Sequence, residues 1–516
     1  MGSIAKEFNG TTGEPLQRAD ELEDLIDAVK SLIVPYVRSA DQAASFKAAG
    51  QVSKGADGQP QNVLIDTHKP AELIEKLKLS LPEAEGRGKE GLLATIQDVL
   101  KYSVNTWDQG FLDKLYASTN AVGVVSELLL SVLNTNVSPR LPSLARLDHH
   151  RENHSPPTSQ PLRLRRPRAG GVTCQGGSAS NLTSIAIARN ALYPECKTAG
   201  NGARRFVLFT SAHGHYSVEK AAVTCGMGAQ AVVPVAVDPA TGCMDPAALR
   251  AAVLRVHDDG DGRTPLYVNA TAGTTVLGSF DDFRAISAVC REFGMWLHID
   301  GSWGGPCIFS ASQKHKLAGS ELADSITVNP HKMMNVPVTC SFLLTNDLTV
   351  FHKANTLPAG YLFHGAGDDG EVYDLADLTL QCGRRADSLK LALAWIYYGA
   401  AGFEKMIDHA FTMAAHMANL IDAAPDFELA SSNPPPCLQI CFYYTPGGKL
   451  AESKEENTRR TREMVGLLIG RGFMVDYAPG PNGSFFRVVV NCQTLKETVE
   501  GLVKALGEVG KEVVGA

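Results

Sequence analysis

The chain has 516 residues, of which 44% are hydrophobic and 20% are charged, and its formal net charge at pH 7 is −7. This composition is typical of a globular protein with several domains' worth of core, and it excludes an intrinsically disordered chain. The mild acidity gives no general attraction to nucleic acid, and no apolar run approaches the ~18 residues that span a bilayer.

The first residues, MGSIAKEFNG, lack the apolar core of a secretory signal. The eleven cysteines are odd in number and include no C-x-x-C pair, which is typical of reduced thiols in a protein core. We therefore expect a cytoplasmic protein with no membrane or nucleic-acid partner. No residues are assigned to a metal site.

Near the start, ELEDLIDAVKSLIV places Leu22, Leu25, Ile26, Val29, Leu32 and Ile33 on one helical stripe. This pattern predicts a helix that docks on the rest of the protein, within an N-terminal segment of residues 1–120. The stretch 140–168 differs from everything around it, with seven arginines, five prolines and no periodicity. An RNA-binding loop is conceivable there, but no aromatic residue is interleaved to stack a base.

From about residue 170 to 335, short apolar runs alternate with helical patterns. In DDFRAISAVCREFGMWLHID, Asp281 is the expected N-cap of a helix, and the strand MWLHID follows at once. Such alternation predicts an α/β fold with a mostly parallel sheet and helices on both faces. After residue 385, helical patterns precede the strands CLQICFYYT and SFFRVVVNC. We therefore expect a large domain over 121–385 and a smaller α+β domain over 386–516.

Polar residues gather where the predicted parallel strands end, which is where such sheets bind ligands. The strand LHID ends at Asp300, SITVNP leads to His331 and Lys332, and VLFTS runs out toward His215. The glycine-rich turn in CQGGSASN leads into a helix, whose free N–H groups suit a phosphate. A phosphate cradle, a carboxylate and an amine together fit pyridoxal 5′-phosphate, which bonds a lysine and pairs its ring nitrogen with an aspartate.

Several motifs occur together in one order: CQGGSASN, HGHYS, NATAGTTVLGSFD, HIDGSWGG, VNPHK, GYLF, YDLADLTLQCGRRADSLK and FFRVVV. Through these motifs the chain resembles the group II pyridoxal-phosphate amino-acid decarboxylases, and the resemblance covers residues 66–137 and 169–510. The branch that they resemble most includes glutamate, cysteine-sulfinate and fungal aspartate decarboxylases. This resemblance implies the aspartate-aminotransferase type of fold (fold type I) and a homodimer with active sites at the subunit interface.

The resemblance also implies residue roles. Lys332 bonds the cofactor, His215 stacks on its ring, and Tyr373, on a mobile loop in that family, protonates the product carbon. The residues implied in cofactor binding are Ser178, Ala179, Thr274, Asp300, Ser302, His331 and Lys332. Ser302 stands where relatives often have alanine.

Arg487 matches an arginine that holds a substrate carboxylate, and Lys114 stands where animal relatives carry glutamine. These two cations favour a small acidic amino acid, and we expect L-aspartate, converted to β-alanine and carbon dioxide. Glutamate, giving GABA, and cysteine sulfinate, giving hypotaurine, are the alternatives. A structural salt bridge is the other interpretation of Arg487.

Two further alternatives remain open. The stretch 140–168 interrupts the family pattern abruptly, as a misread exon boundary would, and it could leave a protein that binds the cofactor without turnover. Transamination or aldehyde synthesis is another reaction of the same cofactor, although Tyr373 as a proton donor favours release of an amine.

Overall fold

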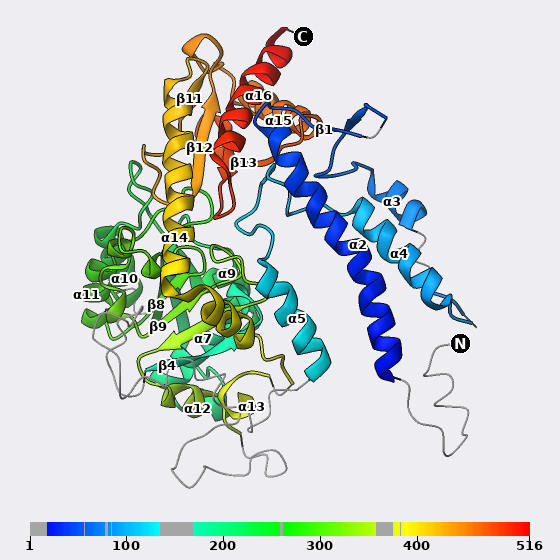
Figure 1. Ribbon diagram of the computed structural model, residues 1–516. Coiled ribbons are helices and arrows are strands. Elements are labelled where there is room, and N and C mark those ends of the chain that lie inside the picture. The colour runs from blue at the N-terminus through cyan, green and yellow to red at the C-terminus, as the bar shows by residue number, and fades with distance from the viewer. Residues whose placement is uncertain are drawn as a thin grey trace, which may run out of the picture.

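The computed structural model describes residues 18–55, 57–77, 81–83, 85–134, 169–258, 262–357, 375–381 and 383–515 (Figure 1). A seven-stranded sheet has the strand order β4-β10-β9-β8-β7-β5-β6. Its strands are β4 Gly170–Cys174, β5 Arg205–Ser211, β6 Val232–Val235, β7 Arg263–Thr271, β8 Trp296–Gly301, β9 Ser325–Val328 and β10 Ser341–Thr345. Pairing is parallel from β6 to β9, whereas β10 runs antiparallel to β9 and β4. The sheet is therefore mostly parallel, as predicted.

Helices cover both faces of this sheet, as the alternating pattern predicts. They are α7 Gly177–Leu192, α8 Cys196–Ala199, α9 Ser217–Thr224, α10 Pro246–Asp258, α11 Phe283–Glu292 and α12 Thr349–Asn355. In β5, Val207 and Phe209 pack in the core that contains α10 and α11, whereas Phe206 and Leu208 pack in the core that contains α7 and α9. Successive side chains of a strand point to opposite faces, so a strand buried on both sides is a continuous apolar run.

The junction before α11 corrects one prediction. Asp282, and not Asp281, caps α11, because its carboxylate accepts two hydrogen bonds of 3.1 Å from N–H groups of the first turn. Asp281 is buried and instead accepts hydrogen bonds from the N–H groups of Met244 and Thr271. Burial raises the pKa of Asp281 to about 6. The prediction that Asp281 caps the helix was wrong by one position, because the Asp281 carboxylate is already hydrogen-bonded to Met244 and Thr271.

A second, five-stranded sheet has the order β11-β12-β14-β13-β3. The strands are β11 Phe427–Leu429, β12 Gln439–Tyr444, β13 Met474–Gly480, β14 Gly483–Val489 and β3 Phe111–Leu112, and the helices are α14 Ser388–Ala423, α15 Lys454–Gly470 and α16 Lys496–Gly515. Figure 1 shows α14 running from beside the large sheet up to β11 and β12. A strand from the N-terminal part of the chain, β3, completes the sheet by pairing in parallel with β13.

The N-terminal part contributes the helices α2 Arg18–Lys47, α3 Pro70–Leu77, α4 Gly88–Tyr102 and α5 Ala121–Leu133, with the short strands β1 Ser53–Lys54 and β2 Pro60–Gln61. Helix α2 docks through its last turn, where Lys47 forms a buried ion pair with Asp108 at 3.0 Å and donates to the Gly472 carbonyl at 2.5 Å. The predicted stripe lies further from the body, and Leu22 is 47% exposed. Among the described residues, no helix has the length and apolar character needed to cross a bilayer.

Candidate active site

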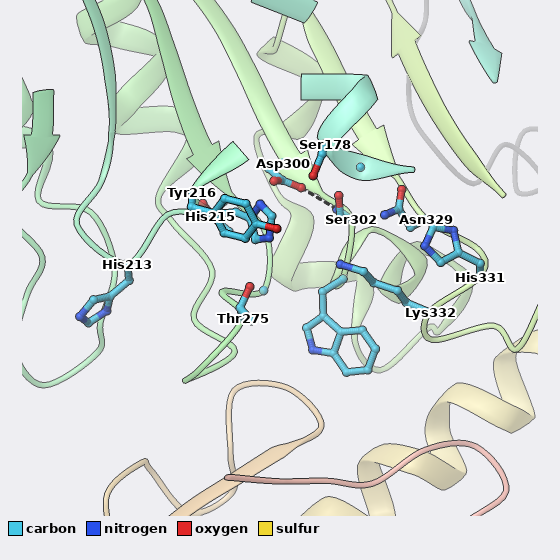
Figure 2. A pocket seen from close by; sticks show the side chains of 14 residues that line it. Ser178, His213, His215, Tyr216, Thr275, Asp300, Ser302, Asn329, His331 and Lys332 are labelled. Atoms are coloured by element: carbon cyan, nitrogen blue, oxygen red, sulfur yellow. Dashed lines mark hydrogen bonds between the residues drawn. The ribbon is translucent and has the colours of Figure 1, made fainter. Parts of the chain in front are cut away.

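A cavity of about 220 Å³ lies beyond the carboxyl ends of β5, β7, β8 and β9. The side chains around it come from the turns that follow these strands and from the start of α7 (Figure 2). Its lining residues include six that the sequence predicts: Ser178, His215, Asp300, Ser302, His331 and Lys332. The order of the parallel strands therefore brings together groups that are far apart in the sequence.

Asp300 is the buried carboxylate of the cavity, at the end of β8. Its Oδ2 accepts a hydrogen bond from Asn181 Nδ2 at 2.8 Å, and its Oδ1 accepts one from the Ser302 N–H at 3.0 Å. Burial raises the pKa of Asp300, but these hydrogen bonds and the charge of Lys332 outweigh it, so the pKa lies below its usual value. Asp300 is therefore ionised at neutral pH.

The buried His298 holds the Asn181 side chain on the side away from Asp300. His298 Nε2 lies 3.1 Å from Asn181 Oδ1, and its Nδ1 lies 2.8 Å from Ser325 Oγ. Burial lowers the pKa of His298 to about 4, so the imidazole is neutral at neutral pH. Neither Asn181 nor His298 was among the predicted residues. The signal for His298 was present, because it precedes Asp300 by two positions in the same strand and so shares its face.

Lys332 follows β9 and reaches into the cavity toward Ser302 and Asp300 (Figure 2). Burial lowers the pKa of Lys332, and the charge of Asp300 opposes this effect only in part. A lowered pKa increases the fraction of uncharged amine, which is the form that attacks a carbonyl carbon. The structure thus gives Lys332 the environment of a nucleophilic amine.

His215 stands beside Tyr216, with ring centroids 4.3 Å apart, in the turn between β5 and α9. The Ser217 N–H donates to His215 Nδ1 at 3.3 Å, which leaves Nε2 as the protonated nitrogen of the neutral ring. Burial lowers the pKa of His215, so the neutral form prevails at neutral pH. A neutral, partly buried imidazole is suited to stack on a planar ligand.

The glycine-rich turn and His331 form the polar end of the cavity. At the N-terminus of α7, the first N–H groups, beginning at Gly177, have no acceptor within the helix. His331 Nδ1 lies 2.6 Å from the Cys340 carbonyl oxygen and 3.1 Å from the Cys340 N. Burial lowers the pKa of His331 to about 4, and the charges of Lys332 and Lys390 act in the same direction. A helix start with free N–H groups suits an anionic group.

The residues present fit pyridoxal 5′-phosphate. A Cβ atom at Gly177 would lie 2.5 Å from Ser302 Oγ and 2.9 Å from Asn329 Nδ2, so only glycine leaves this end of the cavity open. The buried Ser302 Oγ has no hydrogen-bond partner among the described residues. An ionised Asp300 suits a protonated ring nitrogen, and Lys332 suits the aldehyde.

Arg487 and Lys114 lie together, outside the residues that line the cavity. The Arg487 guanidinium is buried and donates to Asp476 Oδ2 at 2.5 Å and to the Thr275 carbonyl at 3.1 Å. Lys114 Nζ lies 3.1 Å from Asp113 and 3.4 Å from the same Asp476 oxygen. Thr275 lines the cavity, so Arg487 lies directly behind its wall. Arg487 Nε is buried and has no hydrogen-bond partner among the residues described.

Ala179 and Thr274, like Arg487 and Lys114, are predicted residues that do not line the cavity. Ala179 packs beside the core that contains α7 and α9, although its N–H belongs to the exposed first turn of α7. Thr274 is buried, and its Oγ1 accepts the Ser279 N–H at 3.0 Å within the turn after β7. Tyr373, like residues 140–168, lies outside the described residues. The lining residues that sequence reasoning missed are Tyr216, Thr271, Gly273, Thr275, Trp303 and Asn329.

Residues 70–445 match the family model described as the pyridoxal-dependent decarboxylase conserved domain. A protein of Metarhizium robertsii named L-aspartate decarboxylase is 59% identical over 512 residues, which is 98% of this chain and 99% of that protein. A glutamate decarboxylase-like protein of Gibberella zeae is 37% identical over 498 residues, covering 89% and 94% of the two chains. The crystal structure of mouse CSAD, 28% identical, superposes with a TM-score of 0.83 over 96% of this chain and 99% of that one.

Proposed function

The chain belongs to the pyridoxal-dependent decarboxylase family, and on that premise we propose that it converts L-aspartate to β-alanine and carbon dioxide. The 59% identical relative is named for this substrate, whereas the 37% identical relative is named glutamate decarboxylase-like. Glutamate and cysteine sulfinate are the other acidic substrates that the same cations would accept.

One observation carries the choice of an acidic substrate: the buried Arg487 has an Nε–H without a partner among the described residues. A buried, unpaired donor on a cation costs free energy unless an acceptor reaches it. A substrate carboxylate is such an acceptor, and a guanidinium binds it with fixed geometry. Burial lowers the pKa of Lys114, but Asp113 and Asp476 raise it by more, so Lys114 stays charged as a second cation.

Bound pyridoxal 5′-phosphate would accept the electron pair that the departing carbon dioxide leaves behind. Asp300, held ionised by Asn181, would keep the proton on the ring nitrogen. Lys332 would bind the aldehyde carbon through its uncharged amine, and His215 would stack on the ring. Ser178, His331 and the first N–H groups of α7, including that of Ala179, would bind the phosphate.

Proton delivery to the product carbon is the role that we propose for Tyr373. Its phenol donates at neutral pH, since tyrosine normally has a pKa near 10. Lys332 and His215 are two groups lining the cavity that also exchange protons. Because the pKa of each is lowered, each is protonated, and so able to donate, in a smaller fraction of molecules at neutral pH than usual. A Tyr373→Phe variant should therefore still release carbon dioxide but form little β-alanine.

We also propose a homodimer in the cytoplasm. Helix α5 exposes a run of large apolar side chains, an arrangement typical of an interface between subunits. They are Val124, Val125, Leu128, Leu129, Val132 and Leu133. The ten cysteines among the described residues are all unpaired, which supports a reducing compartment. Light scattering of the purified protein, with Val125→Lys as a variant expected to dissociate, tests the dimer.

A product assay tests the reaction. Protein loaded with pyridoxal 5′-phosphate is incubated with aspartate, glutamate, cysteine sulfinate and an aromatic amino acid, and the amines are measured by mass spectrometry. β-Alanine as the main product is the expected result. GABA or hypotaurine as the main product would replace aspartate by the corresponding substrate. Full cofactor binding without any amine would instead support an inactive protein, altered in residues 140–168.

A further inference from the structure

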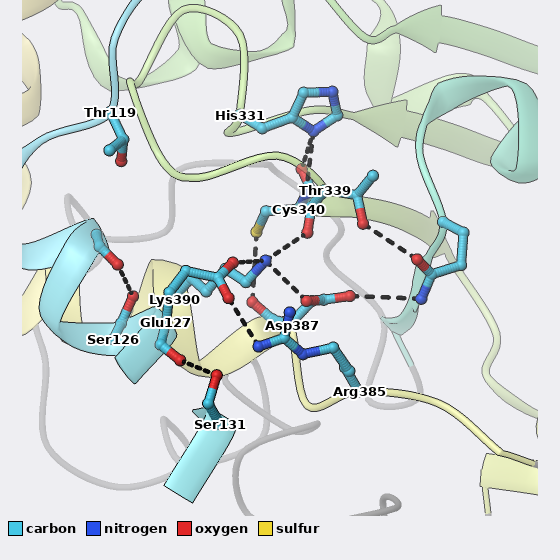
Figure 3. A network of polar contacts seen from close by, with 12 residues as sticks. Thr119, Ser126, Glu127, Ser131, His331, Thr339, Cys340, Arg385, Asp387 and Lys390 are labelled. Carbon is cyan, nitrogen blue, oxygen red and sulfur yellow. Dashed lines mark hydrogen bonds and ion pairs between the residues drawn. The ribbon is translucent and has the colours of Figure 1, made fainter. Parts of the chain in front are cut away.

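A buried ammonium group lies outside the cavity, at the start of α14. The Lys390 side chain is 1% exposed, and its Nζ contacts Glu127 Oε1 at 2.5 Å, Asp387 Oδ1 at 2.9 Å and the Thr339 carbonyl at 3.1 Å (Figure 3). An ammonium group has three N–H donors, so each has one acceptor. Arg385 pairs with the other Glu127 oxygen at 2.7 Å, which balances two cations against two carboxylates.

Lys390, Asp387, Thr339 and Gln175 form a closed ring of contacts. Lys390 binds both Asp387 and the Thr339 carbonyl. Gln175 closes the ring, because its Nε2 donates to Asp387 Oδ2 at 3.4 Å and its Oε1 accepts from Thr339 Oγ1 at 3.1 Å. Gln175 follows the end of β4, Thr339 precedes β10, and Lys390 lies in the first turn of α14; Figure 3 shows Lys390 between Asp387 and Thr339. The ring therefore ties three separate segments of the chain to one charge.

Gln175 and Thr339, the two uncharged members of the ring, each adjoin one of the two walls of the polar end of the cavity, which are the N-terminus of α7 and His331. Gln175 directly precedes the glycine-rich turn, in which Gly177 begins α7. Thr339 directly precedes Cys340, whose carbonyl oxygen and N–H lie 2.6 Å and 3.1 Å from His331 Nδ1, so that this nitrogen bonds to one of the two according to its tautomer. The distance between these two walls thus depends on the contacts of Lys390 with Asp387 and Thr339.

We propose that Lys390 is a positioning residue for the cofactor phosphate, holding the α7 N-terminus and His331 at the separation that a phosphate group needs. This inference rests on the phosphate position proposed above. Lys390 does not line the cavity, so it acts through Gln175 and Thr339. A methionine could fill the same buried space, but it leaves the buried Asp387 carboxylate without its cation, so Lys390→Met should also lose stability. It could not replace the two hydrogen bonds that fix the walls.

Lys47 provides a matched control. Its side chain is also 1% exposed, it also pairs with a buried aspartate, and it also donates to a backbone carbonyl, but in the contact between α2 and the C-terminal sheet. Lys47→Met should therefore reproduce the general cost of removing a buried ammonium. Gln175→Ala is the second test variant, because it opens the ring at an exposed, uncharged side chain and leaves the ion pairs intact.

The experiment measures the dissociation constants of pyridoxal 5′-phosphate and of pyridoxal, which lacks the phosphate, with the full-length protein after removal of its cofactor. Binding is followed by the absorbance of the bound aldehyde, and the melting temperature of each cofactor-free variant is recorded. In Lys390→Met and Gln175→Ala, we expect pyridoxal 5′-phosphate to bind about tenfold more weakly, the scale of one lost hydrogen bond. The affinity for pyridoxal should change less than about twofold, and Lys47→Met should leave the ratio of the two constants at the wild-type value.

Two results would overturn the proposal. An unchanged ratio in Gln175→Ala and Lys390→Met, whether neither ligand or both ligands bind more weakly, with a large ratio in the wild type, would show that the ring is structural only and would leave the phosphate position intact. No difference between the ligands in the wild type would reject the phosphate position itself. If Lys390→Met does not fold, Gln175→Ala alone decides.

Discussion

Replacing Arg487 by glutamine tests the substrate assignment most directly. The guanidinium makes its described contacts with Thr275, Asp113 and Asp476, and its Nε remains for a ligand. A hydrogen bond to a charged group is worth roughly 1.5–3 kcal/mol. Because about 1.4 kcal/mol corresponds to a factor of ten, kcat/KM for L-aspartate should fall about 10- to 150-fold in Arg487→Gln. The loss should lie mainly in KM, since the side-chain carboxylate is bound equally before and during the reaction.

The substitution also breaks an ion pair, and stability has to be separated from binding. Asp476 keeps 28% of its side chain exposed and retains Lys114 at 3.4 Å, so the loss of Arg487 should cost about 1–3 kcal/mol, less than the ~3–5 kcal/mol of a fully buried pair. Arg471→Gln is the control. Arg471 pairs with Glu508 at 2.7 Å and Glu512 at 2.6 Å in the same part of the protein, away from the cavity.

The assay compares initial rates of amine formation at full cofactor occupancy, verified by absorbance, together with urea denaturation of both variants. Arg471→Gln should lose stability without a change in KM. An unchanged KM for aspartate in Arg487→Gln would refute the reasoning, and so would an equal loss of kcat/KM in the two variants. Arg487 would then be a structural salt bridge, the alternative that its position in an apolar strand allows.

Three other predictions concern the cavity and its supports. Asp476→Asn should bind succinate, an unreactive dicarboxylate, about 3- to 10-fold more tightly by calorimetry, because a ligand no longer competes with Asp476 for Arg487; weaker binding would contradict this. Gly177→Ala should weaken binding of pyridoxal 5′-phosphate about tenfold or more, since its Cβ would lie 2.5 Å from Ser302 Oγ, whereas Gly466→Ala, with open space around it, should not. His298 has its pKa lowered from 6.5 to about 4, so the unfolded chain takes up a proton first as the pH falls through this range. Stability is therefore fully present above pH 6.5 and falls by about 3 kcal/mol toward pH 4, and urea denaturation of His298→Gln should show a correspondingly smaller fall.

The site residues that could be predicted from the sequence are those that lie at or just after the end of a predicted strand. Asp300 and Lys332 follow apolar runs that could only be buried strands, and parallel strands bring their ends together. Asn181 could not be found in this way, because it lies on a helix whose rotation about its axis depends on packing. Its contact with Asp300 at 2.8 Å is a tertiary feature.

The fold was predictable where periodicity is strong and failed where an element is short or competes with burial. The two residues of β3, Phe111 and Leu112, are too few to show an alternating pattern in the sequence. Their pairing with β13 in the C-terminal sheet could therefore not be predicted. Asp281 and Asp282 are chemically equal as caps. Asp281 is buried and accepts the N–H groups of Met244 and Thr271, which leaves Asp282 as the cap. These contacts join segments that are distant in the sequence, so a local capping rule cannot predict them.

The pairing of β3 with β13 has a consequence for how the chain is made. Ribosomes release the N-terminus first, so Phe111 emerges long before its partner Met474 is synthesised. Lys47 likewise has to wait for the Gly472 carbonyl, 425 positions later. Contacts of such sequence separation form slowly, and an unpaired strand edge invites association with other chains. Removal of the first 112 residues would therefore leave the C-terminal sheet with an open edge at β13, and such a truncated chain should aggregate.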